Sequence, residues 1–178
     1  MLLSKIYFRI RCFLKIILYK IYFGPRLKIG FDSHFRKNFG LSIEHGAKVE
    51  IGRHTSFNRN CSVNALRLIK IGDYVMFGEN VKLYDHNHAY QVQDDMCHPG
   101  IYKYKGYTYG SIIIEDNVWI GSNVTILKNV TIGKNSVIGA NCLLYKSIPE
   151  GSLVKSNVAF TLEPIRIMNI DSRIGAEG

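Results

Sequence analysis

The stretch that decides the fold spans residues 112–151 and reads IIIEDNVWIGSNVTILKNVTIGKNSVIGANCLLYKSIPEG. An aliphatic residue returns at every sixth position of it, at Ile114, Ile120, Ile126, Ile132, Ile138 and Leu144. Two positions before each of the last five stands a small or β-branched residue, in the order Val118, Val124, Val130, Ser136 and Cys142. Each unit therefore predicts a short strand with two side chains on one face.

The fixed six-residue step indicates a solenoid, because so short a strand buries its apolar face only by stacking on the next coil. An antiparallel sandwich would need strands of about five or six residues plus hairpin loops, for which the step leaves no room. An amphipathic helix repeats about every 3.6 residues, which the step does not match, and it disfavours recurring glycine. Gly121, Gly133 and Gly139 each follow an aliphatic residue, and we expect them at tight corners.

The same repeat appears upstream with less regularity, at Ile51, Phe57 and Val63 and again at Ile71, Phe77 and Leu83, with Val75 and Val81 as inner partners. The change of phase near residue 70 predicts a bulge or a small loop. Between Leu83 and Ile112 the repeat stops, and residues 85–110 are rich in Tyr, His and Asp. Such an excursion from a compact solenoid is typical of a functional loop. Its tyrosines favour stacking on sugar rings, and they are Tyr90, Tyr102, Tyr104, Tyr107 and Tyr109.

Residues 2–23 predict an amphipathic helix, which the Gly24-Pro25 pair ends. All charged residues before Asp32 are basic, namely Lys5, Arg9, Arg11, Lys15, Lys20, Arg26 and Lys28. A bilayer-spanning helix needs about 20 consecutive apolar residues, so we expect residues 1–24 to lie on a surface. That surface is either the inner face of the cytoplasmic membrane, or it belongs to the protein itself, on the same chain or on a neighbouring subunit. The sequence leaves both open.

The rest of the chain is close to neutral, since its 16 basic residues face 14 acidic ones. The net charge of +9 therefore does not indicate a nucleic-acid-binding body. Four widely spaced cysteines without a CxxC pair favour a reducing, cytoplasmic compartment over a disulfide framework. We expect three segments, which are a helix over 1–28, an all-β solenoid over 29–150 with the loop 85–110 inserted, and an extension over 151–178.

Residues 29–150 resemble the left-handed β-helix hexapeptide-repeat acyltransferases, and within them the galactoside and maltose O-acetyltransferase branch that includes capsule and O-antigen acetyltransferases. The most specific part of the resemblance is the run of coils quoted above with its exit into SIPEG. The resemblance implies a left-handed parallel β-helix, a homotrimer with active sites between neighbouring subunits, acetyl-CoA as donor without a metal, and a sugar or oligosaccharide as acceptor.

Direct acyl transfer needs a base that takes the proton of the attacking hydroxyl, and histidine suits this role because its ordinary pKa lies near neutrality. The segment VKLYDHNHAY offers His86 and His88, and the resemblance assigns the base to His88. His86 lies two residues earlier on the same face of an extended strand, so it could also reach the site or orient the acceptor. The resemblance places Asn58 at the acceptor hydroxyl or the catalytic centre, although the sequence equally allows a corner asparagine in a left-handed turn. We expect Tyr84 and Asp85 to contact the acceptor as well. An acidic residue that holds the sugar in galactoside enzymes is replaced by Leu66.

The resemblance also assigns the donor site. It places Trp119, Gly121 and Ser122 along the pantetheine channel, with a backbone N–H for the thioester oxygen. Gly139, Ala140 and Lys146 match the adenine-nucleotide end. The C-terminal segment departs from the family pattern, and Lys155 and Arg166 are the cations nearest to where the nucleotide phosphate would bind.

Three other functions remain open from the sequence. The first is a metal-dependent hydratase resembling the γ-type carbonic anhydrases, with His86 and His88 as ligands and His54 or His98 as the third. The second is a non-catalytic scaffold that binds partners through its N-terminal helix. The third is an N-acyltransferase of an amino sugar, since the same base could deprotonate an attacking amine.

Overall fold

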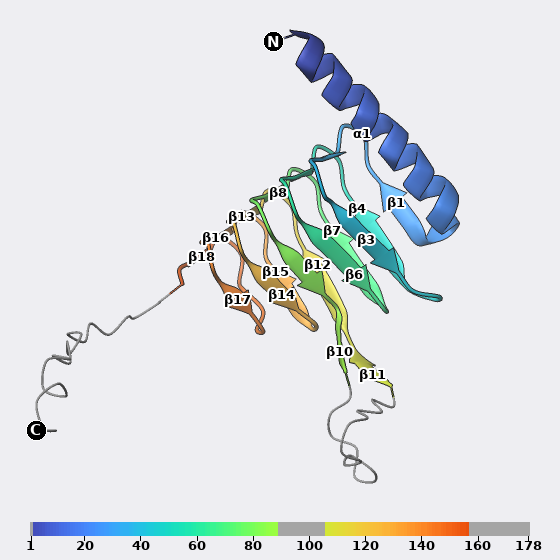
Figure 1. Cartoon of the computed structure of the whole chain (residues 1–178). Coiled ribbons are helices and arrows are strands. Elements are labelled where there is room, and N and C mark those ends of the chain that lie inside the picture. The colour runs from blue at the N-terminus through green and yellow to red at the C-terminus, as the bar shows by residue number, and fades with distance from the viewer. Residues whose placement is uncertain (1, 89–105, 157–178) are drawn as a thin grey trace, which may run out of the picture.

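Three parallel sheets, which the chain visits in the same order in every coil, form the body of the protein (Figure 1). The computed structural model describes residues 2–88 and 106–156, and for residues 2–5 it describes only the backbone. The chain begins with helix α1 (Leu2–Phe23) and a 3₁₀ turn (Gly24–Arg26). The predicted N-terminal helix is thus present, and the predicted stacking of short parallel strands is confirmed.

Each sheet collects one strand from each coil. Sheet A contains β1 (Leu27–Ile29), β4 (Lys48–Ile51), β7 (Leu68–Ile71), β12 (Ser111–Ile114) and β15 (Val130–Ile132). Sheet B contains β2 (His34–Phe35), β5 (Ser56–Phe57), β8 (Met76–Phe77), β13 (Trp119–Ile120), β16 (Val137–Ile138) and β18 (Leu153–Val154). Sheet C contains β3 (Gly40–Ile43), β6 (Ser62–Ala65), β9 (Lys82–Tyr84), β14 (Thr125–Leu127) and β17 (Leu143–Leu144). The strands run from Leu27 to Val154 and so extend beyond the expected 29–150 at both ends.

The core is built from columns of side chains that stack from coil to coil. The aliphatic residues of the repeat are all buried, and so are their inner partners, including Ser136 and Cys142. In sheet B the first three coils fill the column with Phe35, Phe57 and Phe77, and the rings of Phe57 and Phe77 stack with centroids 4.1 Å apart. Burial raises the pKa of the Cys142 thiol. The described cysteines Cys12, Cys61 and Cys142 are buried and free, and Cys97 lies outside the described residues.

Asparagine, and not glycine, supplies the residue with a left-handed backbone at most corners of the later coils. Asn117, Asn123, Asn129, Asn135 and Asn141 all have a positive φ close to 60°. Asparagine tolerates this left-handed backbone better than other residues with a side chain. Their amides form ladders, since Asn123 Nδ2 donates to Asn141 Oδ1 at 3.0 Å and Asn117 Nδ2 to Asn135 Oδ1 at 2.9 Å.

The repeat glycines have a different purpose, which is close approach between coils. A Cβ at Gly121 would lie 2.6 Å from the backbone nitrogen of Ala140, and one at Gly133 would lie 2.4 Å from that of Glu150. Neither glycine has a positive φ. The repeat glycines therefore stand at corners as expected, but the constraint on them comes from the next coil and not from a left-handed backbone.

All extra chain length enters at the corner between sheets C and A. The residues that stack in the first coils of sheet A, Leu27, Val49 and Ile69, are more widely spaced along the chain than the later pair of Ile112 and Val130. The change of phase near residue 70 comes from two residues, 66 and 67, which separate β6 from β7. The longest step, from Ile69 to Ile112, contains the loop. The variation in coil length is thus concentrated on one edge of the solenoid.

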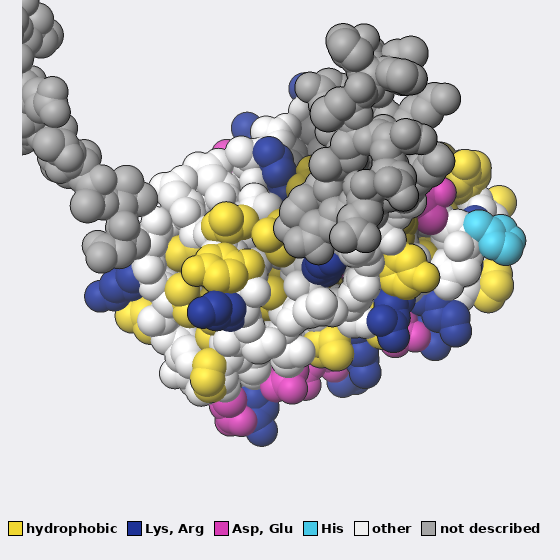
Figure 2. Space-filling view, turned by 90° about the horizontal axis from the view of Figure 1, so that it is seen from below, with side chains coloured by type: hydrophobic (Ala, Val, Ile, Leu, Met, Phe, Trp, Pro, Cys, Tyr) yellow, Lys and Arg dark blue, Asp and Glu magenta, His cyan; other side chains and the backbone are white. Residues whose placement is uncertain are grey.

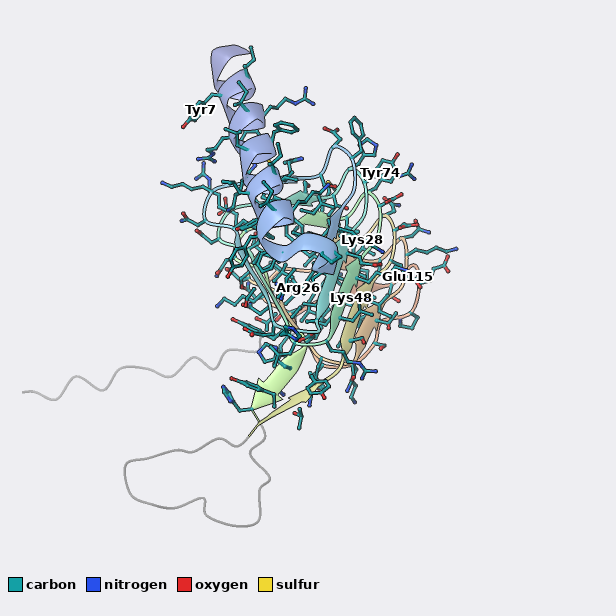
Figure 3. The ribbon with its side chains drawn as sticks, turned by 90° about the vertical axis from the view of Figure 1, so that its right-hand side faces the viewer. Tyr7, Arg26, Lys28, Lys48, Tyr74 and Glu115 are labelled. Atoms are coloured by element: carbon teal, nitrogen blue, oxygen red, sulfur yellow. The ribbon has the colours of Figure 1, made fainter. Side chains whose placement is uncertain are left out.

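Helix α1 covers the N-terminal end of the solenoid, and it runs across that end when the molecule is viewed along the direction in which the coils stack (Figure 3). Cys12 and Phe23 are buried against the first coil, and Cys12 Sγ accepts the Phe35 N–H at 3.3 Å. Lys15 Nζ donates to the Phe39 carbonyl at 2.8 Å. The Tyr19 hydroxyl donates to the same oxygen at 3.1 Å. Burial lowers the pKa of Lys15 and raises that of Tyr19.

Among the described residues, no helix is both long enough and apolar enough to cross a membrane.

The stacking constraint predicts opposite outcomes for two glycines. A Cβ at Gly52 would lie 2.4 Å from the Gly72 backbone, whereas one at Gly40 would meet only Ser62 Cβ at 3.7 Å. We expect Gly52→Ala to lower the free energy of unfolding by about 1–3 kcal/mol, because two coils must move apart. Gly40→Ala should leave it within about 0.5 kcal/mol of the wild type or raise it. Urea unfolding of both variants checks this, and equal effects would contradict the close-approach argument.

Candidate active site

A two-stranded antiparallel hairpin forms the base of the loop. Strand β10 (His86–His88) pairs with β11 (Tyr107–Tyr109), with His86 opposite Tyr109 and His88 opposite Tyr107. The Gly110 N–H donates to the Asp85 carbonyl at 2.7 Å, so the chain returns to the solenoid beside the residue where it left. Lys128 Nζ donates to the Thr108 hydroxyl and ties β11 to the neighbouring coil. The base of the loop is therefore fixed to the corner between sheets C and A.

Asp85 fixes this corner from inside. Its side chain is completely buried, and its two carboxylate oxygens accept the backbone N–H groups of Leu66 at 2.8 Å, Arg67 at 2.8 Å and Leu68 at 2.9 Å. Charge-assisted bonds of this kind are stronger than neutral ones. The expected contact of Asp85 with the acceptor stays a prediction, because what the structure shows is that its oxygens bind the backbone of this irregular corner. Leu66 serves this corner with its backbone.

The two histidines share one aromatic cluster but have different surroundings. His86 Nδ1 lies 3.1 Å from Asp85 Oδ1, and its side chain is only 17% exposed. The ring of Tyr107 contacts both histidines, with its centroid 5.6 Å from that of His86 and 4.7 Å from that of His88. Tyr84 meets His86 edge to face at 6.2 Å. His88 is exposed at the end of β10. The structure thus holds His86 through a buried carboxylate and places His88 toward the outside.

Tyr107 is the residue of this cluster that sequence reasoning did not single out. It was counted only as one of five tyrosines, because nothing in the sequence shows that β11 pairs with β10. Its position shortly before Ser111, where the repeat resumes, could have indicated that Tyr107 lies at the base of the loop. Tyr90, Tyr102 and Tyr104 lie outside the described residues.

Asn58 lies at another corner, between sheets B and C. Its φ is not positive, so it is not a left-handed corner residue, and that part is taken by Asn60. The Asn58 side-chain oxygen accepts the Arg59 N–H at 2.9 Å. The width of sheet C separates this corner from the histidine cluster, and one chain therefore does not bring Asn58 and the histidines to one point.

Trp119, Gly121 and Ser122, the residues assigned to the pantetheine channel, line the same B–C side of the solenoid as Asn58. Trp119 is 53% exposed on the outer face of β13, as its place in the repeat predicted. The Gly121 N–H donates to the Ile138 carbonyl at 2.7 Å and is therefore not available to a thioester oxygen. Ser122 Oγ accepts the Glu79 N–H at 3.1 Å. The Ser122 N–H makes no hydrogen bond within the described residues and remains the possible donor at this corner.

The candidate nucleotide contacts divide between two corners. Gly139 donates its N–H to the Val154 carbonyl at 2.7 Å, and the Lys155 backbone lies directly beside it, so Gly139, Ala140 and Lys155 stand together. Lys146 follows β17 at the C–A corner, where its ammonium lies 5.7 Å from the ring centroid of Tyr145. Arg166 lies outside the described residues.

His54, a candidate third ligand of the hypothetical metal site, lies in different surroundings from His86 and His88. His54 stacks on Tyr74 with centroids 4.9 Å apart, and its Nδ1 lies 3.4 Å from Asp32 Oδ2, at the corner between sheets A and B. It is thus not a neighbour of His86 and His88. The described part of the chain contains no group of three or more His, Cys, Asp or Glu side chains placed to hold a metal. His98 lies outside it.

Residues 111–146 match the family of bacterial transferase hexapeptide repeats. A Schizosaccharomyces pombe protein named as an acetyltransferase is 35% identical over 127 residues, which cover 71% of this chain and 56% of that protein. Two crystal structures are similar in fold as well as in sequence. The hexapeptide-repeat acetyltransferase of Vibrio cholerae, solved with acetyl-coenzyme A, is 31% identical over 71% of this chain and 64% of its own, with a TM-score of 0.60. A maltose O-acetyltransferase of Clostridium difficile is 29% identical over 72% and 64%, with a TM-score of 0.56.

The chain therefore spans less than two thirds of the length of these relatives. The stretch that matches the family, residues 111–146, contains most of the repeat that decides the fold.

The corner chemistry predicts that Asp85→Asn destabilises the protein strongly. The amide group of Asn would face one of the backbone N–H groups that the carboxylate accepts, and it would leave that donor unpaired in a buried place. We expect a loss of about 2–3 kcal/mol in the free energy of unfolding. Asp116→Asn is the matched control, because exposed Asp116 accepts only one backbone N–H, that of Asp73 at 2.7 Å. Thermal unfolding checks this, and an equal effect of both substitutions would refute the role of Asp85.

Proposed function

We propose that this chain, whose repeats belong to the bacterial transferase hexapeptide family, is an acetyl-CoA-dependent O-acetyltransferase that acts on a sugar hydroxyl. The observation that carries the proposal is the cluster of His86, His88 and Tyr107 at the base of the only long insertion among the described coils. It stands on a body that we take to be a left-handed β-helix, and its relatives include a protein solved with acetyl-coenzyme A and one named for maltose.

In this reaction His88 takes the proton from the acceptor hydroxyl as its oxygen attacks the thioester carbonyl. The tetrahedral intermediate carries an oxyanion, for which the unpaired Ser122 N–H is the candidate donor. The carbon–sulfur bond then breaks, the acetyl group stays on the sugar, and the proton passes from His88 to the CoA thiolate. Asp85 holds His86 beside the base, and Tyr107 offers a ring face and a hydroxyl at the acceptor position.

The two corners favour an active site between subunits. The histidine cluster lies at the C–A corner, and Trp119, Ser122 and Asn58 line the B–C side, so a single chain keeps the base and the donor residues apart. A second chain that turns its B–C side toward the first chain's C–A corner would bring them together. Such a head-to-tail contact closes into a ring, and the family resemblance implies a ring of three copies. Hydrophobic side chains gather on the underside of the C-terminal coils, as a subunit contact would need (Figure 2). Leu143 of β17 and the following Tyr145 are both mostly exposed in the single chain.

The choice of base is tested by separate substitutions of the two histidines. We expect His88→Ala to lower acetyl transfer or slow acetyl-CoA hydrolysis by about 100-fold or more, because general-base catalysis contributes about that much. Binding of acetyl-CoA should be retained. His86→Ala should have a smaller effect on the rate, since His86 acts through its neighbours. Thiol release from acetyl-CoA and calorimetric binding measure both, and the opposite order of effects would assign the base to His86.

The donor assignment predicts a binding defect without a folding defect. Trp119→Ala should raise the Kd for acetyl-CoA about tenfold, which corresponds to about 1.4 kcal/mol, because the exposed indole loses its contact with the donor. Phe31→Ala is the control, since Phe31 is 77% exposed at the opposite end of the solenoid. Calorimetry on both variants decides this. If neither variant nor the wild type binds acetyl-CoA, the proposed activity is wrong although the fold stands.

A further inference from the structure

Helix α1 presents a second apolar face, which no described residue covers. Its inner face packs on the first coil, whereas residues spaced three or four apart on the other side are exposed. These residues form what we term the outer stripe, and they are Ile6, Tyr7, Ile10, Phe13, Leu14, Ile17, Leu18, Ile21 and Tyr22. Figure 3 shows Tyr7 projecting away from the body. A helix that is apolar on both sides needs a partner on each.

The groove beside the outer stripe is strongly basic. It lies between α1 and the first coils, with a volume of about 1470 Å³. Six cationic residues line it, and Asp32 is the single acidic residue among its lining residues. The cations are Arg9, Arg11, Lys20, Arg36, Lys37 and Arg59. Arg9 pairs with Asp32 at 3.5 Å, whereas Arg11, Arg36, Lys37 and Arg59 form no ion pair within the described residues. Three of these four stand on the solenoid and not on the helix, so the positive charge does not follow from helix composition alone.

We infer that this end of the molecule binds the surface of an anionic phospholipid bilayer, with the outer stripe in the acyl boundary and the groove cations at the headgroup phosphates. An amphipathic helix with cations along its edges binds such a surface through both contributions. Phe13 and Phe31 are both exposed and line the groove, so apolar and cationic groups lie together. This inference is independent of the proposed acetyl transfer.

The charges argue against a second copy of this chain as the occupant. The part of the chain that precedes Asp32 contains seven cations and no acidic residue. Two such faces in contact would place like charges together and lose binding energy. An anionic bilayer instead offers negative charge and an apolar interior at the depth that a surface-bound helix reaches.

Vesicle sedimentation with the full-length protein tests the inference. We expect the wild type to bind vesicles of phosphatidylcholine with about one third phosphatidylglycerol at least about tenfold more tightly than phosphatidylcholine alone. The stripe variant Ile10→Ser/Leu14→Ser/Ile21→Ser should lose this binding. Its control is Tyr74→Ser/Met76→Ser, which removes apolar groups that are about equally exposed on the third coil. Circular dichroism and sedimentation velocity on the variants establish folding and oligomeric state.

The groove is tested by Arg36→Gln/Lys37→Gln/Arg59→Gln, which should lower binding to anionic vesicles about ten- to a hundredfold and leave the weak binding to neutral ones unchanged. Lys48→Gln/Lys70→Gln/Lys134→Gln removes three exposed lysines from other faces and should bind like the wild type. The inference is overturned if the wild type binds anionic vesicles no more tightly than neutral ones, or if the stripe variant binds them as tightly as the wild type. It is overturned equally if the stripe variant changes only the mass of the assembly, since the stripe would then be a contact between copies.

Discussion

The in-register stacking of coils is the constraint on which the rest of this structure depends. Each coil donates its backbone N–H groups to the carbonyls of a neighbouring coil, and the repeat glycines allow the chains to approach closely enough at the corners. Because the columns of buried side chains must stay aligned, a coil with extra residues has to place them outside the columns. The protein places all of them at the corner between sheets C and A. The position of the candidate site is a consequence of that restriction.

The buried carboxylate of Asp85 connects this restriction to chemistry. It satisfies the three backbone donors of the irregular corner in the preceding coil and at the same time lies against His86. One ionisable group therefore stabilises the corner and orients a side chain at the base of the loop. Its own backbone carbonyl closes the loop through Gly110. The framework and the site share this residue, which explains why the histidines stand on a hairpin with a fixed base.

The sequence was most informative where the determinants are local and periodic. The six-residue step identified the stacked strands, and the cations between apolar clusters identified the helix. It did not show why Gly121 must be glycine, because close approach depends on which coil lies above, and it did not show the burial of Asp85, which depends on a corner in the preceding coil. The same limit applies to Tyr107, whose contact with the histidines requires the pairing of β10 with β11. Stacking periodicity predicts the columns, whereas corner contacts depend on the register between coils.

The unequal spacing of the paired strands has a consequence for how the protein folds. In the last regular coils a strand meets its partner after three repeats of the six-residue step, as Ile112 meets Val130, but β7 and β12 meet only across the whole loop. Closing the longer segment costs about 0.8 kcal/mol more in chain entropy, before any contact within the loop is counted. Nucleation should therefore favour the C-terminal coils, on which the earlier coils then assemble. Residues 112–144, which determine the fold in sequence, would also be the first to adopt it in time.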